Sequence, residues 1–515
     1  MKRGLVFLLV VAAPICAFTW QAQLATFGDD SASYLTLAHY FSPSGSAIVS
    51  QWAGYHSNFP PIFPMLLALT GGAQSLHVAY ALVAVCAAIG TALFYRYAAL
   101  ELGERSGIVV AVLFLLTATA WVSLKGVLSE SLFLLVSVAA LLFHETRIAS
   151  RRPAVWEWLV LGALLACVAL TRAIGIVMAL AYVLHVLVRF AGRQRPSSIA
   201  FLPVVPVVVL VGLWQVLKPR APVDAYGVAM SYVVGSWLAD PARTFARASS
   251  FFFDGWTRSF LADSNAPLVA KVAFAVVGLL AIGGLLMRLR RNCLDAWYVG
   301  ITLDVVFAWV FSGETTRRLL YPVIPLVILC AAIPVLAMVA RLAPRARTIA
   351  LAATTALPAL LCLPVLAMLW ERSLDDGPVI AGCPQTYREI ADSYWTRDAE
   401  DARKLAVLEV TMLCGLQSLE KVTPPDSIVM WVRPEYVALV GRRPAAAYYY
   451  AWTADDLARE IRQSNASYLI TTLVDKTDLA GNVRRPTSAS GDAMSAPVFS
   501  LSDGIFEVRK VIPAN

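Results

Sequence analysis

Two adjacent carboxylates, Asp29 and Asp30, follow the first apolar run of this sequence. Ionisable groups at the edge of a run that can cross a membrane are costly unless they face water or carry a function. Apolar side chains at helical spacing come next: Tyr34, Leu35, Ala38 and Phe41. This spacing predicts a helix directly after the two acids. The pair is the first candidate for proton-transfer chemistry, because a well-placed carboxylate can act as a general base.

Further charged residues lie at the ends of later apolar runs, on the same side of the predicted membrane as the two acids. They are Lys125, Glu130, Arg172, Arg317 and Arg318. Basic residues that gather at one level predict a site for an anion, and a lipid phosphate is the obvious candidate. Arginine binds phosphate through two parallel N–H donors, and lysine binds it through a compact charge.

The composition is that of a polytopic membrane protein. Of the 515 residues, 59% are hydrophobic and 15% are charged, whereas soluble domains carry about 25% charged residues. Eleven apolar runs predict membrane-spanning helices: 4–22, 74–98, 106–122, 127–145, 155–171, 173–190, 199–217, 268–289, 294–312, 318–340 and 346–370. The net charge of +8 lies in short clusters at the ends of these runs. No basic stripe with interleaved aromatic residues occurs, which argues against nucleic-acid binding.

The basic clusters also predict the orientation of the spans. With the N-terminus in the cytoplasm, every cytoplasmic connection contains arginine or lysine, as the positive-inside rule requires. An odd number of spans then places the C-terminal region outside, which in a bacterium is the periplasmic side of the inner membrane. The first run also fits a cleaved signal peptide, but its length of about 20 residues favours a retained helix. Either alternative leaves the two acids on the outer side.

The predicted topology divides the chain into a membrane domain, 1–370, and a small periplasmic α/β domain, 371–515. The membrane domain has two large outer loops, 23–73 and 218–267. Residues 241–263 in the second mix arginine and aromatic residues, which is typical of an amphipathic interfacial helix, although a packed loop fits equally well. In the C-terminal domain we predict helices at 398–421 and 454–463, strands at 427–432 and 468–473, and a hairpin over 499–508. Cys383 and Cys414 either pair as a disulfide there or remain thiols.

Five short motifs occur in order along the predicted outer side. They are Asp30-x-x-x-Tyr34, Asn58-Phe59-Pro60-Pro61, Leu128-Ser129-Glu130-Ser131, Thr171-Arg172-x-x-Gly175 and Arg317-Arg318-x-x-Tyr321-Pro322. The set resembles the GT-C superfamily of membrane glycosyltransferases, and within it the bacterial aminoarabinose transferases and protein O-mannosyltransferases. Alignment by Tyr34 places Asp30 on the catalytic acid of the family. Ser31 stands where many relatives have a second acid, and Asp29 would take that role from the other side.

The resemblance implies a GT-C-like all-α membrane fold and an inverting transfer of a sugar from a polyprenyl-phosphate donor to an acceptor hydroxyl or phosphate. The lipid phosphate is a good leaving group, so one base on the acceptor is sufficient. Asp30 would be that base, with Asp29 beside it, and Glu130 would orient the base or the acceptor. The departing phosphate would be neutralised by the basic residues Lys125, Arg172, Arg317 and Arg318.

Four residues are candidates for contacts with the sugar or the acceptor: Tyr34, Tyr55, His56 and Tyr321. The partners expected are a polyprenyl-phosphate sugar, membrane lipid, and a glycan, lipid or protein acceptor. A divalent metal is possible, but the sequence offers no convincing set of ligands and no cofactor motif. The main alternative is a transporter or carrier of a lipid-linked or anionic substrate, which would place its ionisable groups near the membrane midplane.

Overall fold

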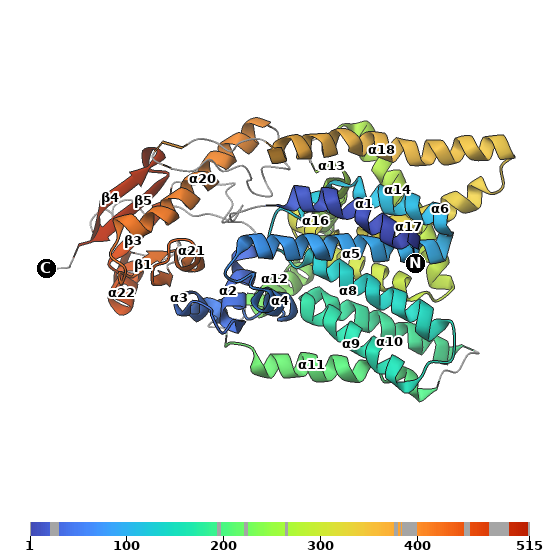
Figure 1. Cartoon of the computed structure of the whole chain (residues 1–515), viewed down its shortest axis with the longest axis horizontal. Helices are drawn as coiled ribbons and strands as arrows, with labels where there is room; N and C mark the ends of the chain where they lie inside the picture. Colours follow the sequence, from blue (N-terminus) through green and yellow to red (C-terminus); the bar gives the residue numbers. More distant parts are fainter. Residues whose placement is uncertain are drawn as a thin grey trace.

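The structure is a computed structural model that describes residues 2–20, 30–192, 197–220, 225–262, 266–374, 380–381, 383, 399–447, 454–472 and 494–512. Asp29, one of the two predicted acids, lies outside these residues. Within these residues, helices fill most of the chain up to Leu374, and a small sheet with three α-helices forms the C-terminal part (Figure 1).

The membrane part contains a long helix at its centre and other helices around it. The central helix, α5 (Leu76–Leu102), begins at Ser75, whose side chain accepts a hydrogen bond from the backbone N–H of Val78, and ends at Gly103. The other helices are α1 (Lys2–Thr19), α6 (Glu104–Leu115), α7 (Ala118–Val122), α8 (Glu130–Phe143), α9 (Val155–Thr171), α10 (Ile176–Ala191), α11 (Val204–Leu217), α12 (Ala225–Ala239), α13 (Pro241–Leu261), α14 (Leu268–Arg290), α15 (Leu294–Ala308), α16 (Gly313–Leu320), α17 (Ile324–Val339) and α18 (Pro344–Leu374).

Several of these helices can cross a membrane. Within the described residues, six are long and apolar enough: Leu76–Leu102, Glu130–Ala149, Ala173–Ala191, Ser198–Leu217, Leu268–Arg290 and Pro344–Leu374. The pair α16 and α17, bent by 75°, is a seventh candidate. The other predicted runs are also helical but shorter. The chain is therefore an integral membrane protein, and the count of eleven crossings stays a prediction.

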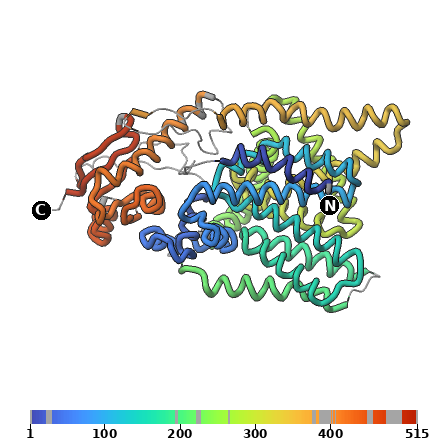
Figure 2. Tube along the Cα trace, viewed as in Figure 1, coloured from blue at the N-terminus to red at the C-terminus, as the bar shows by residue number. Residues whose placement is uncertain are grey.

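The first outer loop folds into short helices rather than an open connection. After Asp30 come α2 (Ser31–Phe41), α3 (Ala47–Ser50), the 3-10 helix η1 (Gln51–His56) and α4 (Ile62–Thr70). The predicted helix after the acids is thus confirmed. Nearly the whole of α2 is buried, because neighbours cover it on more than one side. Figure 2 shows this loop between the bundle and the C-terminal part.

The described residues of the second outer loop are also helical, so that of the two alternatives left open for residues 241–263 the structure has a helix. The interfacial position of this helix stays a prediction. The helix, α13, packs along α16, and the contact is close at Gly255, where a Cβ atom would lie 2.5 Å from the side chain of Thr316. Asp240 caps the first turn of α13 by accepting a hydrogen bond from the backbone N–H of Arg243. Gly255 therefore allows α13 to hold α16 at short range.

The C-terminal part is a mixed five-stranded sheet with helices, and it confirms the predicted elements. The strands are β1 (Val429–Trp431), β2 (Ala445–Ala447), β3 (Tyr468–Thr472), β4 (Ser495–Leu501) and β5 (Phe506–Val511), in the order β2-β1-β3-β5-β4. β1 is parallel to both of its neighbours, whereas β5 is antiparallel to β3 and β4. The helices are α20 (Ala399–Val422), α21 (Pro434–Leu439) and α22 (Ala454–Ser464).

A small apolar cluster joins the C-terminal part to the first outer loop. Val49 and Trp52 of the loop are buried against Ala438 of α21. The helices α2 and α21 are also in contact. Helix α21 of the C-terminal part therefore packs directly on the loop that contains Asp30.

Cys383 and Cys414 form a disulfide, with their Cα atoms 5.8 Å apart. Of the two alternatives left by the sequence, the structure has the bridged one. The bridge ties the segment before α20 to the middle of that helix.

We expect Cys383→Ala to lower the free energy of unfolding of the C-terminal part by about 4 kcal/mol, because loss of the bridge frees a long loop in the unfolded chain. The sequence separation of the two cysteines is 31 residues. Proteolysis of the C-terminal part across a urea series measures the change. Cys16→Ala, at an exposed free cysteine, is the control. Equal urea midpoints for the two variants would contradict the prediction.

Candidate active site

Four of the predicted residues meet in one cluster, which we call the acid–arginine cluster: Asp30, Glu130, Arg172 and Arg318. The guanidinium of Arg318 donates from Nη2 to Asp30 Oδ2 at 2.8 Å and to Glu130 Oε1 at 3.1 Å. Its Nε donates to the same Glu130 oxygen at 3.2 Å. Arg172 Nη1 lies 2.7 Å from Glu130 Oε1. Two acids and two arginines thus form one connected group.

Each member of the cluster is held at the end of a helix. Asp30 is the residue before α2, and Glu130 is the first residue of α8. Arg172 separates α9 from the following 3-10 turn and has an extended backbone, with φ −145° and ψ 145°. Arg318 lies on α16, just before the bend into α17. The side chain of Ser312 caps α16 by accepting a hydrogen bond from the backbone N–H of Thr315.

Hydrogen bonds from neutral residues connect the elements that carry the charges. Ser31 Oγ accepts a bond from the backbone N–H of Val127 at 2.9 Å, which ties the start of α2 to the segment before α8. The hydroxyl of Tyr34 lies 2.6 Å from Ser129 Oγ, and Arg172 donates to the same serine hydroxyl at 3.4 Å. Burial raises the pKa of the Tyr34 hydroxyl, so it stays protonated and can donate to Ser129.

The cluster is buried at one end and reaches water at the other. Glu130 has no exposed side-chain surface, whereas 32% of the Asp30 side chain is exposed. The two arginines lie between these extremes, at 12% for Arg172 and 13% for Arg318. Asp30 is therefore the member that can exchange protons with a hydroxyl or with water, and Glu130 is the fixed centre.

The other predicted residues lie elsewhere. Lys125 is buried, and its Nζ donates to the backbone carbonyl of Phe18 at 2.7 Å and lies 4.2 Å from the centre of that ring. Arg317 is fully buried, next in the chain to the partly accessible Arg318. The roles of both residues on a phosphate stay predictions.

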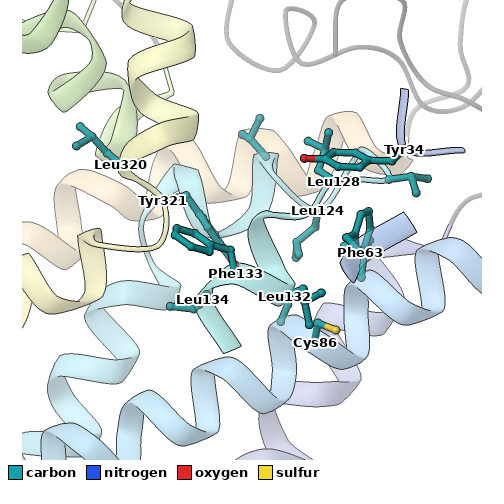
Figure 3. Close-up of a cluster of buried hydrophobic side chains, with 14 of the residues drawn as sticks. Tyr34, Phe63, Cys86, Leu124, Leu128, Leu132, Phe133, Leu134, Leu320 and Tyr321 are labelled. Atoms are coloured by element: carbon teal, nitrogen blue, oxygen red, sulfur yellow. The ribbon is translucent and has the colours of Figure 1, made fainter. Parts of the chain in front are cut away.

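The predicted tyrosines fall into two groups. Tyr34 and Tyr321 are both buried, and Tyr34 packs edge-on against Phe63 at 5.1 Å while Tyr321 packs against Phe114 at 6.1 Å. Figure 3 shows both tyrosines in a cluster of buried hydrophobic side chains, with Tyr321 beside Phe133. Tyr55 is exposed and packs on Trp52. The contacts predicted between these tyrosines and a sugar stay predictions.

Sequence reasoning missed three residues near the site. Ser129 links Tyr34 to Arg172, and only its position beside Glu130 in the motif could have indicated it. Arg433 and Glu435 of the C-terminal part form an ion pair, with 3.1 Å between Nε and Oε1, and both act electrostatically on His56. The charge of Asp30 also acts on His56, whose pKa it tends to raise. No local pattern predicts this approach of α21 to the first loop.

Metal ligands are not grouped in the described part of the chain. There, no set of three or more His, Cys, Asp or Glu side chains could hold a metal ion. Asp29 is outside that part. Within the cluster, the positively charged groups are the guanidinium groups of Arg172 and Arg318.

Comparison with known proteins gives a fold and no close relative. No family model and no curated protein sequence matches the chain. Among solved structures, ArnT from Cupriavidus metallidurans bound to undecaprenyl phosphate is similar over 99% of this chain and 98% of its own, with 14% identity and a TM-score of 0.59. The same protein in the apo state gives 15% identity and a TM-score of 0.55, with 99% of both chains covered.

A third similar structure is the archaeal oligosaccharyltransferase AglB from Archaeoglobus fulgidus, in complex with an inhibitory peptide and a dolichol-phosphate. It has 12% identity and a TM-score of 0.51, over 99% of this chain and 75% of its own. The whole chain thus has the fold of the GT-C membrane glycosyltransferases, as the motifs predicted.

We expect Glu130→Gln to destabilise the protein more than Asp30→Asn, although both residues bind Arg318. Loss of the buried charge leaves Arg172 without the carboxylate that it pairs with and Arg318 with Asp30 alone, which costs about 3 kcal/mol. Loss of the more exposed charge costs less than about 1 kcal/mol. Thermal unfolding of the purified variants in one detergent measures both. A larger loss for Asp30→Asn would show that Glu130 is not the centre of the cluster.

His56 gives a prediction on pH. Burial is the main cause that lowers its pKa below the usual value, while Glu435 and Asp30 act to raise it and Arg433 to lower it. The folded pKa of His56 lies below the unfolded one, so the folded protein favours the neutral imidazole. The stability that neutral His56 contributes is complete above the usual pKa and is lost as the pH falls toward the folded pKa. We expect acidification from about pH 7.5 to about pH 5.5 to loosen the contact between η1 and α21.

The rate of proteolysis between the first loop and the C-terminal part measures this loosening. His56→Gln removes the part of the pH dependence that His56 causes. His77→Gln, at an exposed histidine, is the matched control and keeps the dependence. The same pH profile in both variants would exclude His56 as the cause.

Proposed function

We propose that the chain is an inverting glycosyltransferase that moves a sugar from a polyprenyl-phosphate donor to a hydroxyl or phosphate group of an acceptor in the cell envelope. The observation that carries the proposal is the acid–arginine cluster. It joins one partly exposed carboxylate to two arginines around a buried acid, with contacts between 2.7 and 3.2 Å.

The roles follow from exposure and charge. Asp30 accepts the proton of the acceptor hydroxyl as the hydroxyl oxygen attacks the anomeric carbon of the donor sugar. The bond from that carbon to the phosphate oxygen breaks on the opposite face, so the configuration inverts. Arg172 and Arg318 stabilise the negative charge that grows on the departing lipid phosphate. No second acid is needed, because the phosphate leaves without a proton.

Glu130 has a different role in this proposal from the one expected on the sequence. Glu130 is connected to Asp30 by way of Arg318, which binds both acids. The Oε1 atom of Glu130 itself pairs with both arginines. It is therefore a positioning residue for the phosphate-binding arginines rather than for the base. A carboxylate buried between two guanidinium groups fixes their separation and direction.

The similar structures support the substrate class. ArnT was solved with undecaprenyl phosphate, and AglB with dolichol-phosphate and an inhibitory peptide. A lipid phosphate is the anion that two arginines at a membrane boundary suit best. The donor transfers a hexosyl or pentosyl group, and the acceptor is a glycan, a lipid or a protein.

Location and domain division follow the orientation predicted by the basic clusters. We place the protein in the inner membrane of a bacterium, with the acid–arginine cluster and the C-terminal domain on the periplasmic side. The membrane domain would comprise residues 1–370 and the periplasmic domain 371–515. A transporter would place its ionisable groups near the membrane midplane, whereas the predicted orientation puts this cluster toward the outer side of the membrane.

We expect Asp30→Asn to reduce sugar transfer by about 10²- to 10⁴-fold, the usual contribution of a general base. Membrane insertion and yield should stay normal, since Asp30 is partly exposed. Mass analysis of envelope glycans, in cells that carry each variant as the only copy of the gene, measures the product.

Asp254→Asn is the matched control for this experiment. Asp254 also has 32% of its side chain exposed and also pairs with an arginine, Arg258, at 3.0 Å. This variant should form the product at the wild-type level. Normal product from Asp30→Asn would exclude Asp30 as the base.

A further inference from the structure

One arginine serves both acids of the cluster. Arg318 Nη2 donates to Asp30 Oδ2 at 2.8 Å and to Glu130 Oε1 at 3.1 Å. In the proposed reaction the same guanidinium must also bind the phosphate of the donor, and Asp30 must be able to receive a proton. Asp30 and the phosphate therefore compete for one donor group, and both are negatively charged.

The two bonds of Arg318 are not equally easy to break. Glu130 is fully buried and also holds Arg172, so its separation from Arg318 would leave a buried charge less compensated. Asp30 is the more exposed partner, and water can solvate its carboxylate once the bond is lost. An incoming anion therefore displaces Asp30 from Arg318 and leaves the bond to Glu130 in place.

The surroundings of Arg318 confine this exchange to side chains. The backbone of α16 is fixed at its start by the cap of Ser312 and along its length by α13, where Gly255 lies against Thr316. Beyond α16 the chain bends by 75° into α17. Arg318 therefore stays next to Glu130, while Asp30, at the first residue before α2, can turn away.

We propose that the Arg318–Asp30 ion pair is a latch that the lipid phosphate opens. The latch rests on the proposed function and adds regulation to it. Without donor, Arg318 holds Asp30 through Oδ2 and keeps the carboxylate turned toward the arginine rather than toward an acceptor. With donor, the phosphate takes the place of Asp30 on Arg318, and Asp30 is released next to the acceptor. No covalent bond changes in this step. The order of events follows: donor binding comes before activation of the acceptor.

The test is a double-mutant cycle on binding of undecaprenyl phosphate to the full-length protein in lipid nanodiscs. Asp30→Asn removes the competitor and should tighten binding roughly three- to tenfold, the range expected for a partly buried ion pair. Arg318→Gln should weaken binding. In the Arg318→Gln background the gain from Asp30→Asn should disappear.

The cycle separates the latch from a general effect of charge. If Asp30→Asn tightens binding equally in both backgrounds, the gain is long-range repulsion and the latch is wrong. Unchanged affinity in Asp30→Asn also overturns the latch alone. If the wild-type protein does not bind the lipid phosphate, the proposed function fails and the latch fails with it.

Two further variants complete the experiment. Asp254→Asn, which removes an equally exposed and paired carboxylate, should leave the affinity within twofold of wild type. If Arg318→Gln is lost during purification, Arg318→Lys provides the second background, because one ammonium group cannot make the same forked contacts. A gain from Asp30→Asn that is undiminished in the Arg318→Lys background would overturn the latch.

Discussion

The burial of Glu130 is the constraint on which the site depends. A carboxylate without exposed surface is stable in the folded protein only where cations and donors surround it. Its Oε1 atom receives Arg172 at 2.7 Å and Arg318 at 3.1 Å. These residues come from segments far apart in the sequence, so one buried oxygen brings together the start of α8, the end of α9 and the turn before α17.

Breaks in the helical backbone place these side chains at the acid–arginine cluster. Between α9 and α10 the chain leaves the helical conformation at Arg172, and the next turn is so tight that a Cβ atom at Gly175 would lie 2.1 Å from the carbonyl oxygen of Val168. Such breaks are tolerated at membrane depth only where the chain is buried in protein or lines a polar cavity. The ion pair of Arg172 with Glu130 places this break beside a polar cluster, which satisfies that condition.

The sequence predicts well what depends on local spacing. The helix at 398–421 is α20, and the hairpin over 499–508 is formed by β4 and β5. The five motifs named all four residues of the acid–arginine cluster. Their pairing could not be predicted, because Asp30 and Arg318 are 288 positions apart and no periodicity connects them. The sequence also could not predict which of Arg317 and Arg318 binds the acids. Neighbours on a helix point about 100° apart, and only the tertiary packing decides which one faces the acids. The contact of Lys125 could not be predicted from local spacing either, because its Nζ donates to a backbone carbonyl of α1, far away in the sequence.

The gradient of burial across the cluster suits the chemistry that we propose. Arginines act strongly on a phosphate where water is excluded, since the local dielectric is low and the donors are already oriented. A base must instead be accessible to the hydroxyl group of the acceptor. The cluster meets both requirements, because contacts of about 3 Å connect Glu130, whose side chain is fully buried, to Asp30, whose side chain is 32% exposed. A cluster buried throughout would exclude the acceptor, and one exposed throughout would bind the phosphate weakly, so the proposed reaction requires a cluster that is buried at one end and exposed at the other.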